Sequence, residues 1–184
     1  MSQSEDEEAS INFVESKTRE VQRRIKGARI VVALFGAGGS GLKERRSIAQ
    51  ELTSIGVVVV IPEDALPAAL APSLLERLIL SSDDLDLVFV NVDSWGSAAE
   101  FSEFRNNQKV APKLRVLVER DYHPLYGSSK GYLTDAYLTH DAVFGHVYMY
   151  RKTNERSVDR TPTPRDIVLT ISERYRQWKA LSST

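Results

Sequence analysis

The stretch VVALFGAGGSGLKERRS, residues 31–47, joins an apolar run to a glycine-rich turn and then to a charged segment. In RIVVALF, residues 29–35, an unbroken apolar run follows Arg29, and it predicts a strand that is buried on both faces. After the glycines, apolar residues recur at helical spacing, which predicts a helix packed on a sheet. They are Leu42, Ile48, Leu52 and Ile55. A strand, a glycine turn and a helix in this order indicate an α/β fold.

The same alternation continues along the chain. Apolar runs predict further strands at 57–62, 85–92, 113–119 and 146–150, the last of them at a sheet edge. Helices are expected at 42–56, 71–82, 97–107 and 163–183, whereas 121–144 and 151–163 show no regular pattern. Strands that alternate with helices at this spacing predict right-handed crossovers. We therefore expect an α/β three-layer sandwich, flavodoxin-like or Rossmann-like, with a mainly parallel five-stranded sheet.

The ends of the chain differ in composition from its middle. Residues 1–9 are acidic and polar, and we expect a disordered tail there because they offer little apolar surface to bury. Residues 10–184 are expected to form one domain, with flanking helices at 10–27 and 163–183. The terminal helices carry apolar residues that are candidates for self-association, namely Phe13, Val14 and Trp178.

Composition excludes several function classes. The formal net charge is −1, which gives no electrostatic footprint for nucleic acid. The chain has no cysteine, so disulfides and thiolate chemistry are excluded. No apolar stretch reaches the roughly 18 residues of a membrane span, and the acidic start does not resemble a targeting peptide. We expect a cytoplasmic protein without a membrane partner.

The glycine loop is open to several interpretations. Gly36, Gly38 and Gly41 formally fit a dinucleotide-binding fingerprint, but the acid expected at the end of the next strand is replaced by valine. A phosphate-binding P-loop requires lysine and a hydroxyl directly after the last glycine, whereas Leu42 and Lys43 follow here. A simple tight turn is the third possibility. In each case small residues at a helix start let a phosphate or ribose approach backbone N–H groups.

A second cluster follows the third predicted strand, in NVDSWGSAAEFSEF, residues 91–104. Asp93 ends the strand, and Ser97 is expected to cap a helix whose first turn contains Glu100. The helix dipole would then favour the ionised form of Glu100. Such a carboxylate beside a second acid is suited to glycosyl chemistry. The alternative is that Glu100 simply caps its helix. Trp95 is either a lid over a flat ring or an ordinary rim aromatic.

Other polar residues have simpler interpretations. His123 follows the fourth predicted strand, where it could reach the site together with Tyr122 and Lys130 as phosphate or ring contacts, but we expect it to be a solvated loop residue. His140 and His146 share no ligand spacing with acids, so we expect no metal site. The charge run KERR, residues 43–46, is expected to be a solvated helix face.

The chain resembles the nucleoside 2-deoxyribosyltransferase-like superfamily, which shares its architecture with TIR domains and SLOG nucleotide-binding domains. The likeness lies in ALFGAG, IAQELTSIGVVVVIPED and DLDLVFVNVDSWGSAAEFSEF, within residues 29–120. It implies that Glu100 is the nucleophile that attacks the sugar and that Asp93 is its partner, with Glu76 as an approximate counterpart of the acid that contacts the sugar. SWGSAAE is also similar to the catalytic segment of TIR-type NAD glycohydrolases.

The resemblance implies a set of site residues and a ligand class. Glu100 and Asp93 are expected to be catalytic. Substrate binding is expected at Phe35, Gly36, Ala37, Gly38, Gly39, Ser40, Glu76, Ser94, Trp95, Gly96 and Ser97. NAD or a nucleotide is expected as substrate or ligand, with no separate cofactor.

Three functions stay open from the sequence. The first is an N-glycosidase that acts on NAD, a nucleotide or a nucleoside, in the setting of bacterial antiviral defence or stress. The second is a non-catalytic SLOG-like subunit that binds a nucleotide and signals to a partner protein. The third is an interaction scaffold. Self-association or a defence-system partner is expected in each case.

Overall fold

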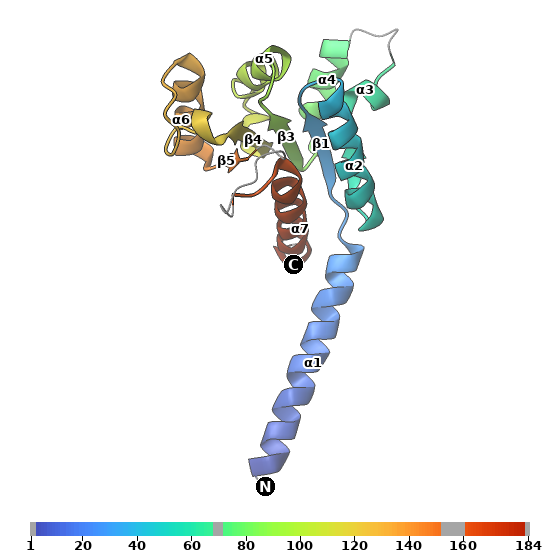
Figure 1. Cartoon of the computed structure of the whole chain (residues 1–184). Coiled ribbons are helices and arrows are strands. Elements are labelled where there is room, and N and C mark those ends of the chain that lie inside the picture. Colours follow the sequence, from blue (N-terminus) through green and yellow to red (C-terminus); the bar gives the residue numbers. More distant parts are fainter. Residues whose placement is uncertain (1–2, 68–71, 152–160, 183–184) are drawn as a thin grey trace. The chain divides into compact units, whose positions relative to one another are not determined.

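The computed structural model describes residues 3–67, 72–151 and 161–182. The chain divides into two compact units, one made of residues 1–29 with 173–184 and the other of residues 30–172. The larger unit contains the whole sheet (Figure 1). It also contains every predicted site residue.

Five strands form one sheet in the order β2-β1-β3-β4-β5. They are β1 (Val31–Phe35), β2 (Val58–Val60), β3 (Leu87–Asn91), β4 (Leu114–Glu119) and β5 (Val147–Tyr150). Every neighbouring pair is parallel, and in register Phe35 lies opposite Val90. The predicted α/β fold with a five-stranded sheet is confirmed, and β5 lies at an edge as expected.

Helices connect the strands of this unit. They are α2 (Ser40–Ser54), α3 (Pro62–Ala65), α4 (Pro72–Leu80), α5 (Trp95–Phe104), α6 (Tyr132–Phe144) and the first part of α7 (Pro164–Ser182). Short 3-10 turns lie at Ala111–Lys113 and Arg120–Tyr122. The prediction that 121–144 is irregular is wrong, because α6 occupies its second half. A parallel connection from β4 to β5 needs a long crossover, which α6 supplies. Most of the other irregular stretch, 151–163, lies outside the described residues.

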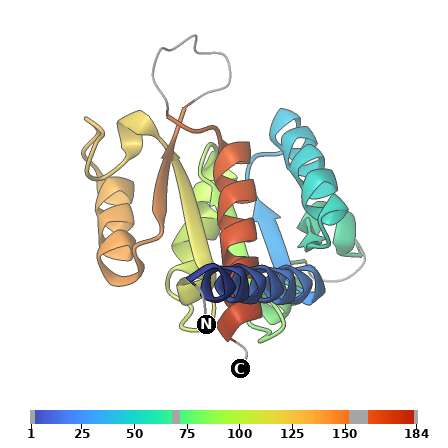
Figure 2. The same ribbon diagram turned by 90° about the horizontal axis from the view of Figure 1, so that it is seen from below.

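The sheet is covered on both faces, which explains why its strands consist mainly of apolar residues. On one face, Ala33, Phe35 and Val90 join a buried cluster with residues of α4, α5 and α6. On the other face, Leu34 and Phe89 line a small cavity of about 20 Å³ with residues of α2 and α7. In Figure 2 the start of α7 lies in front of the sheet and α5 behind it. The domain therefore has three layers, as expected for this fold class.

The smaller unit contains α1 (Gln3–Gly27) and the last part of α7. The helix ends at Gly27 as predicted but begins at Gln3 rather than Ser10, so the prediction of a disordered tail over 1–9 is wrong from Gln3 onward. Residues 1–2 lie outside the described residues. The dipole of a helix stabilises acidic residues near the helix start, an effect that composition alone does not reveal.

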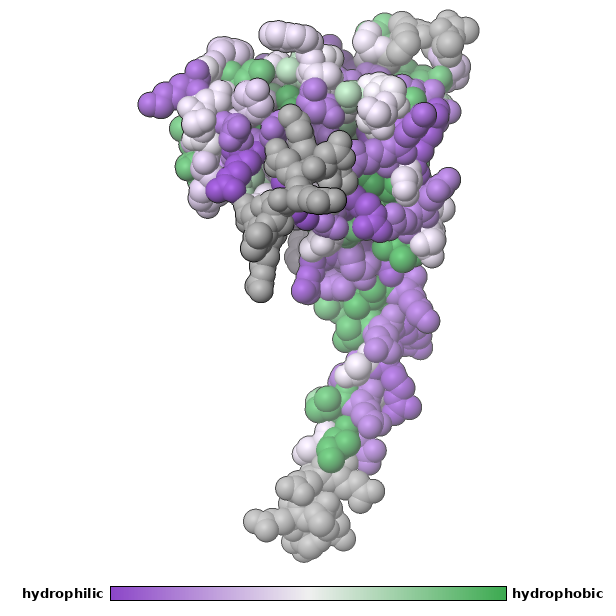
Figure 3. All heavy atoms as spheres, viewed as in Figure 1, coloured by the Kyte–Doolittle hydropathy of each residue, from purple (hydrophilic) through white to green (hydrophobic). Residues whose placement is uncertain are grey.

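The surface of α1 carries apolar side chains. Ile11, Phe13 and Val14 are exposed. Figure 3 shows hydrophobic surface on this helix. Among the helices of the described ranges, none combines the length and the apolar character that crossing a membrane requires.

Candidate active site

The strand order creates a topological switch point at the carboxyl ends of β1 and β3. From β1 the chain passes to β2 on one side, and β3 then pairs with β1 on the other side. Open α/β sheets bind ligands at such a switch point. The glycine loop follows β1 and Asp93 follows β3, so the two predicted clusters flank this switch point.

The structure brings the two clusters into direct contact. The backbone N–H of Ala37 donates a hydrogen bond to Oδ1 of Asp93 over 3.1 Å. The amide of Asn91 donates to the other carboxylate oxygen over 3.0 Å. Asp93 is itself exposed. Its carboxylate therefore ties the end of β3 to the loop after β1 and still faces solvent.

The glycine loop needs its glycines at two positions. Gly36 has φ of +154° and Gly39, the residue before α2, has φ of +60°. An added Cβ at Gly36 would lie 3.4 Å from both the Cβ and the carbonyl oxygen of Asn91. Residues 38–40 are exposed, so this part of the loop is accessible to a ligand.

Phe35, which precedes the loop, lies in the core rather than at the loop surface. It is 3% exposed, and its ring packs edge-on against Phe104 with centroids 4.9 Å apart. Its role in this structure is to pack β1 against α5.

Sequence reasoning missed the residue beneath the loop, Arg45. The prediction that 43–46 is a solvated face is wrong at this position, because Arg45 is only 6% exposed. Its guanidinium donates to the carbonyls of Gly36 and Ala37, at 3.1 and 2.9 Å, and forms a bidentate ion pair with Glu63. Burial of the Glu63 carboxyl raises its pKa, but the hydrogen bonds and charge of Arg45 outweigh this effect and hold the pKa of Glu63 below its usual range. The sequence signal that could have indicated this ion pair is the adjacent acid pair Glu63 and Asp64, which matches the adjacent arginines 45 and 46. Arg45 pairs with Glu63, and Arg46 pairs with Asp64.

The start of α5 is fixed by a capping box. Ser94 is the residue before the helix, and its hydroxyl accepts the backbone N–H of Ser97 at 3.2 Å, while the hydroxyl of Ser97 accepts the backbone N–H of Ser94 at 3.0 Å. The prediction that Ser97 is the cap is wrong by one helical turn. Ser97 is buried in this network, whereas Trp95 is 91% exposed and Gly96 is exposed beside it. Trp95 thus lies in solvent at the first position of α5.

Glu100 lies in the second turn of α5, not in its first, because the helix begins at Trp95. Its side chain is half-buried, and its Oε2 atom is buried without a hydrogen-bond partner among the described residues. Burial, followed by repulsion from Glu76, raises the pKa of Glu100 to about 7. The expectation that its surroundings favour the ionised form of Glu100 is therefore wrong. The helix dipole acts mainly on the first turn, and here desolvation and like charges dominate.

Four elements supply the charges that act on Glu100. Glu76 of α4, Glu63 of α3 and Asp93 after β3 raise its pKa, and Arg45 of α2 lowers it. The pKa of Glu76 is itself raised, first by burial and then by Glu63 and Glu103. Perturbed acids grouped at a sheet edge are typical of a functional site, although ion-pair networks also perturb acids.

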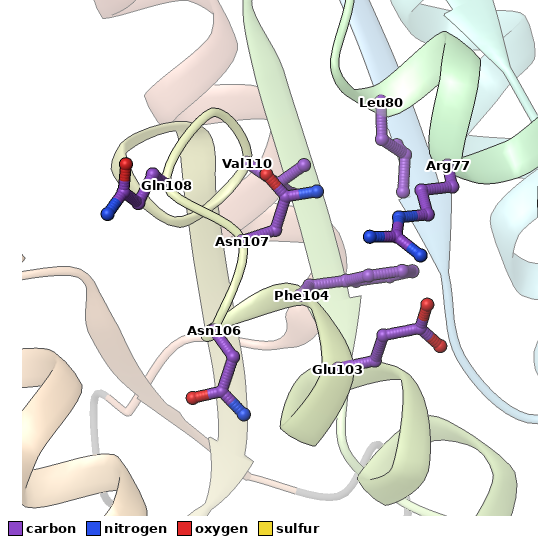
Figure 4. Close-up of a pocket in the computed structure, with 8 residues that line it drawn as sticks. All are labelled: Arg77, Leu80, Glu103, Phe104, Asn106, Asn107, Gln108 and Val110. Atoms are coloured by element: carbon purple, nitrogen blue, oxygen red, sulfur yellow. The ribbon is translucent and has the colours of Figure 1, made fainter.

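A pocket of about 510 Å³ lies at the carboxyl ends of α4 and α5 (Figure 4). It is lined by Arg77, Leu80, Glu103, Phe104, Asn106, Asn107, Gln108 and Val110. In Figure 4 Arg77 and Leu80 extend from α4 toward Phe104 of α5, while Asn106 and Gln108 point away from that ring. Sequence reasoning did not find this pocket, since its residues come from two helix ends and a loop without a shared motif.

The histidine after β4 lies in the interior rather than in solvent. The prediction that His123 is solvated is wrong, because the side chain is 4% exposed and stacks on Tyr126 with centroids 4.9 Å apart. Its Nδ1 accepts the backbone N–H of Leu125 at 3.2 Å, so His123 holds the loop after β4. Tyr122 and Lys130 of that loop are exposed. Within the part of the chain that the structure describes, no group of three His, Asp or Glu side chains is arranged to hold a metal.

Comparison of the sequence with protein-family models and with curated proteins finds no match.

Proposed function

We propose that this protein is an N-glycosidase that cleaves the N-glycosidic bond of NAD or of a nucleotide or nucleoside. The observation that carries the proposal is Glu100, a half-buried carboxylate with an unpartnered Oε2 atom at the switch point of the sheet. It lies on the helix that follows Asp93, and the pKa of its carboxyl is raised to about 7. A carboxylate in a partly desolvated setting beside other acids is the group that glycosyl transfer uses.

In the proposed reaction the bond between the sugar anomeric carbon and the base nitrogen breaks. The bonding electron pair leaves with the base, and the sugar carbon becomes oxocarbenium-like. The ionised Glu100 attacks this carbon or stabilises its positive charge. Water then adds at the same carbon and breaks the sugar–Glu100 bond where one has formed, so that Glu100 is released as the carboxylate. The proton that water loses passes to the released base or to solvent. Glu76 and Asp93 add negative charge around the site, which favours a transition state with positive charge on the sugar. Asp93 orients ribose or base, and the loop at 36–40 contacts sugar or phosphate.

The raised pKa predicts how the rate depends on pH. Because the ionised form of Glu100 is the reactive one, the rate should rise as pH increases through about 7 and then level off. A rate that falls over this range would instead indicate that the protonated carboxyl is required.

The test is mass spectrometry of NAD, nucleotides and nucleosides after incubation with the purified protein. The wild type should release a free base from at least one compound, and Glu100→Gln should reduce release at least about 100-fold. Glu103→Gln is the matched control, since it removes an exposed carboxylate from the same helix. If the wild type releases no base from any compound, or if Glu100→Gln keeps the full rate, the proposal is wrong.

A second candidate is a nucleotide-binding subunit that signals to a partner protein. The same pKa of about 7 favours it, because much of Glu100 is then protonated at neutral pH and is a weak nucleophile. A nucleotide that raises the melting temperature and is recovered intact after long incubation would support this function over the enzyme. In either case we propose a cytoplasmic protein that acts as a homo-oligomer or with a defence-system partner.

A further inference from the structure

Arg45 joins the backbone of the glycine loop to the acidic side of the site. Besides its bonds to Gly36 and Ala37, its guanidinium donates to the carbonyl of Leu34 at 3.2 Å. Three backbone carbonyls at the end of β1 are thus turned toward one buried cation. Glu63 completes the arrangement with hydrogen bonds of 2.9 and 2.6 Å.

This arrangement depends on the shape of a guanidinium. Arginine presents several N–H donors in a rigid plane, whereas lysine offers one compact ammonium on a flexible stem. A lysine at position 45 would keep the charge, but it would not hold three carbonyls and both carboxylate oxygens together. The loop between β1 and α2 would then lose the contacts that fix its path.

Arg45 also acts on Glu100 by its charge. Four charged groups act on the pKa of Glu100. Three of these groups, Glu76, Glu63 and Asp93, are acids. Arg45 is the cation among these groups, and its Nε atom is buried without a hydrogen-bond partner in the described part of the chain. The net charge near Glu100 therefore depends on Arg45 and on how far the negative charge of Glu63 neutralises the positive charge of Arg45.

We propose that Arg45 is the positioning residue of this site, which fixes the glycine loop against Glu63 and sets the charge that Glu100 faces. Its importance for turnover rests on the proposed function, but its effect on the loop and on Glu100 does not. Arg45 does not touch the reacting atoms in this scheme. It acts through the loop backbone and through Glu100.

The test is an NMR titration of the Glu100 carboxyl, which needs no turnover. In Arg45→Met the titration midpoint should rise by about 0.5 of a pH unit or more, because a cation is lost. In Glu63→Gln it should fall by a similar amount, because an acid is lost. Arg45→Lys should leave the midpoint near that of the wild type but move the amide signals of residues 36–39. Arg46→Lys is the control, since Arg46 is exposed and pairs with Asp64.

The outcomes separate this proposal from the proposed function. If Arg45→Met and Glu63→Gln move the midpoint in opposite directions while the wild type releases no base, the positioning role holds and the glycosidase does not. If the wild type is active but neither variant moves the midpoint, the positioning role is overturned. Should Arg45→Met fail to fold, Glu63→Gln and Arg45→Lys decide the question. Unchanged loop signals in Arg45→Lys would equally overturn it.

Discussion

Glu100→Gln should stabilise the folded protein at alkaline pH. The carboxyl has an ordinary pKa of 4.5, and burial with repulsion from Glu76 raises it to about 7 in the folded chain. Between these two values the unfolded chain has released its proton and the folded chain retains it. The free energy of unfolding therefore falls as pH rises from about 4.5 through about 7, and this loss persists above it. Glutamine is neutral throughout and does not undergo this change.

The magnitude follows from the size of the pKa change. The rise from 4.5 to about 7 corresponds to about 3 kcal/mol, since one pKa unit equals about 1.4 kcal/mol. Glu100 is only half-buried, so solvent screening reduces this value, and we expect about 1–2 kcal/mol. Glu100→Gln should thus be more stable than the wild type by about this amount at pH 8 and nearly equal to it at pH 4.

Urea denaturation of both proteins across this pH range measures the difference directly. Glu103→Gln serves as the reference, because Glu103 lies one turn along α5 and is exposed. Its difference from the wild type should stay within about 0.5 kcal/mol and vary little with pH. A Glu100→Gln difference that does not change between pH 4 and pH 8 would refute the reasoning, because a raised pKa must appear as this dependence.

Three further substitutions test the packing and backbone that hold the site. Ser94→Ala should lower the free energy of unfolding by about 1 kcal/mol, because it removes the N-cap of α5, and Ser102→Ala on the same helix is a suitable comparison by urea denaturation. Gly36→Ala should lower the free energy of unfolding by more than about 1 kcal/mol, because Gly36 has φ of +154° and Asn91 lies close. Thermal unfolding measures this loss, and an unchanged melting temperature would show that the backbone relaxes freely and contradict the prediction. Phe101→Ala should cost about 3–5 kcal/mol, because Phe101 is fully buried, and a calorimetric change below about 1 kcal/mol would contradict the packing described.

The strands were predictable because each consists mainly of apolar residues, with Arg115 in β4 as an exception. Residues such as Val32, Leu34 and Val88 are almost fully buried, and a sheet covered on both faces requires this composition. The glycine loop and Asp93 were predictable as neighbours for a related reason, since parallel strands bring their carboxyl ends to one edge. Their contact from Ala37 to Asp93 follows from that topology.

The helix α6 was missed because its local signals are weak. Its preceding residue, Gly131, makes no side-chain cap, and the helix carries Thr and aromatic residues that are poor helix formers. Ala136, Tyr137 and His140 are nevertheless buried at helical spacing. Gly145, which has φ of +68°, ends the helix in the left-handed conformation typical of a helix C-terminus. Tertiary packing and the need for a crossover, more than propensity, determine this element.

The protonation of Glu100 shows where sequence reasoning reaches its limit. The sequence correctly placed this acid on the helix after β3, but its charge state depends on groups from α2, α3 and α4 that lie far away along the chain. One of these, Arg45, has the sequence context of a solvated helix face and is buried because three carbonyls and Glu63 satisfy its guanidinium. A buried charge is tolerated only where such partners converge, and convergence is a property of the fold. The ionisation that the proposed chemistry needs is therefore determined by the packing around the site, so variants of Arg45 and Glu63 should alter it without any change at Glu100.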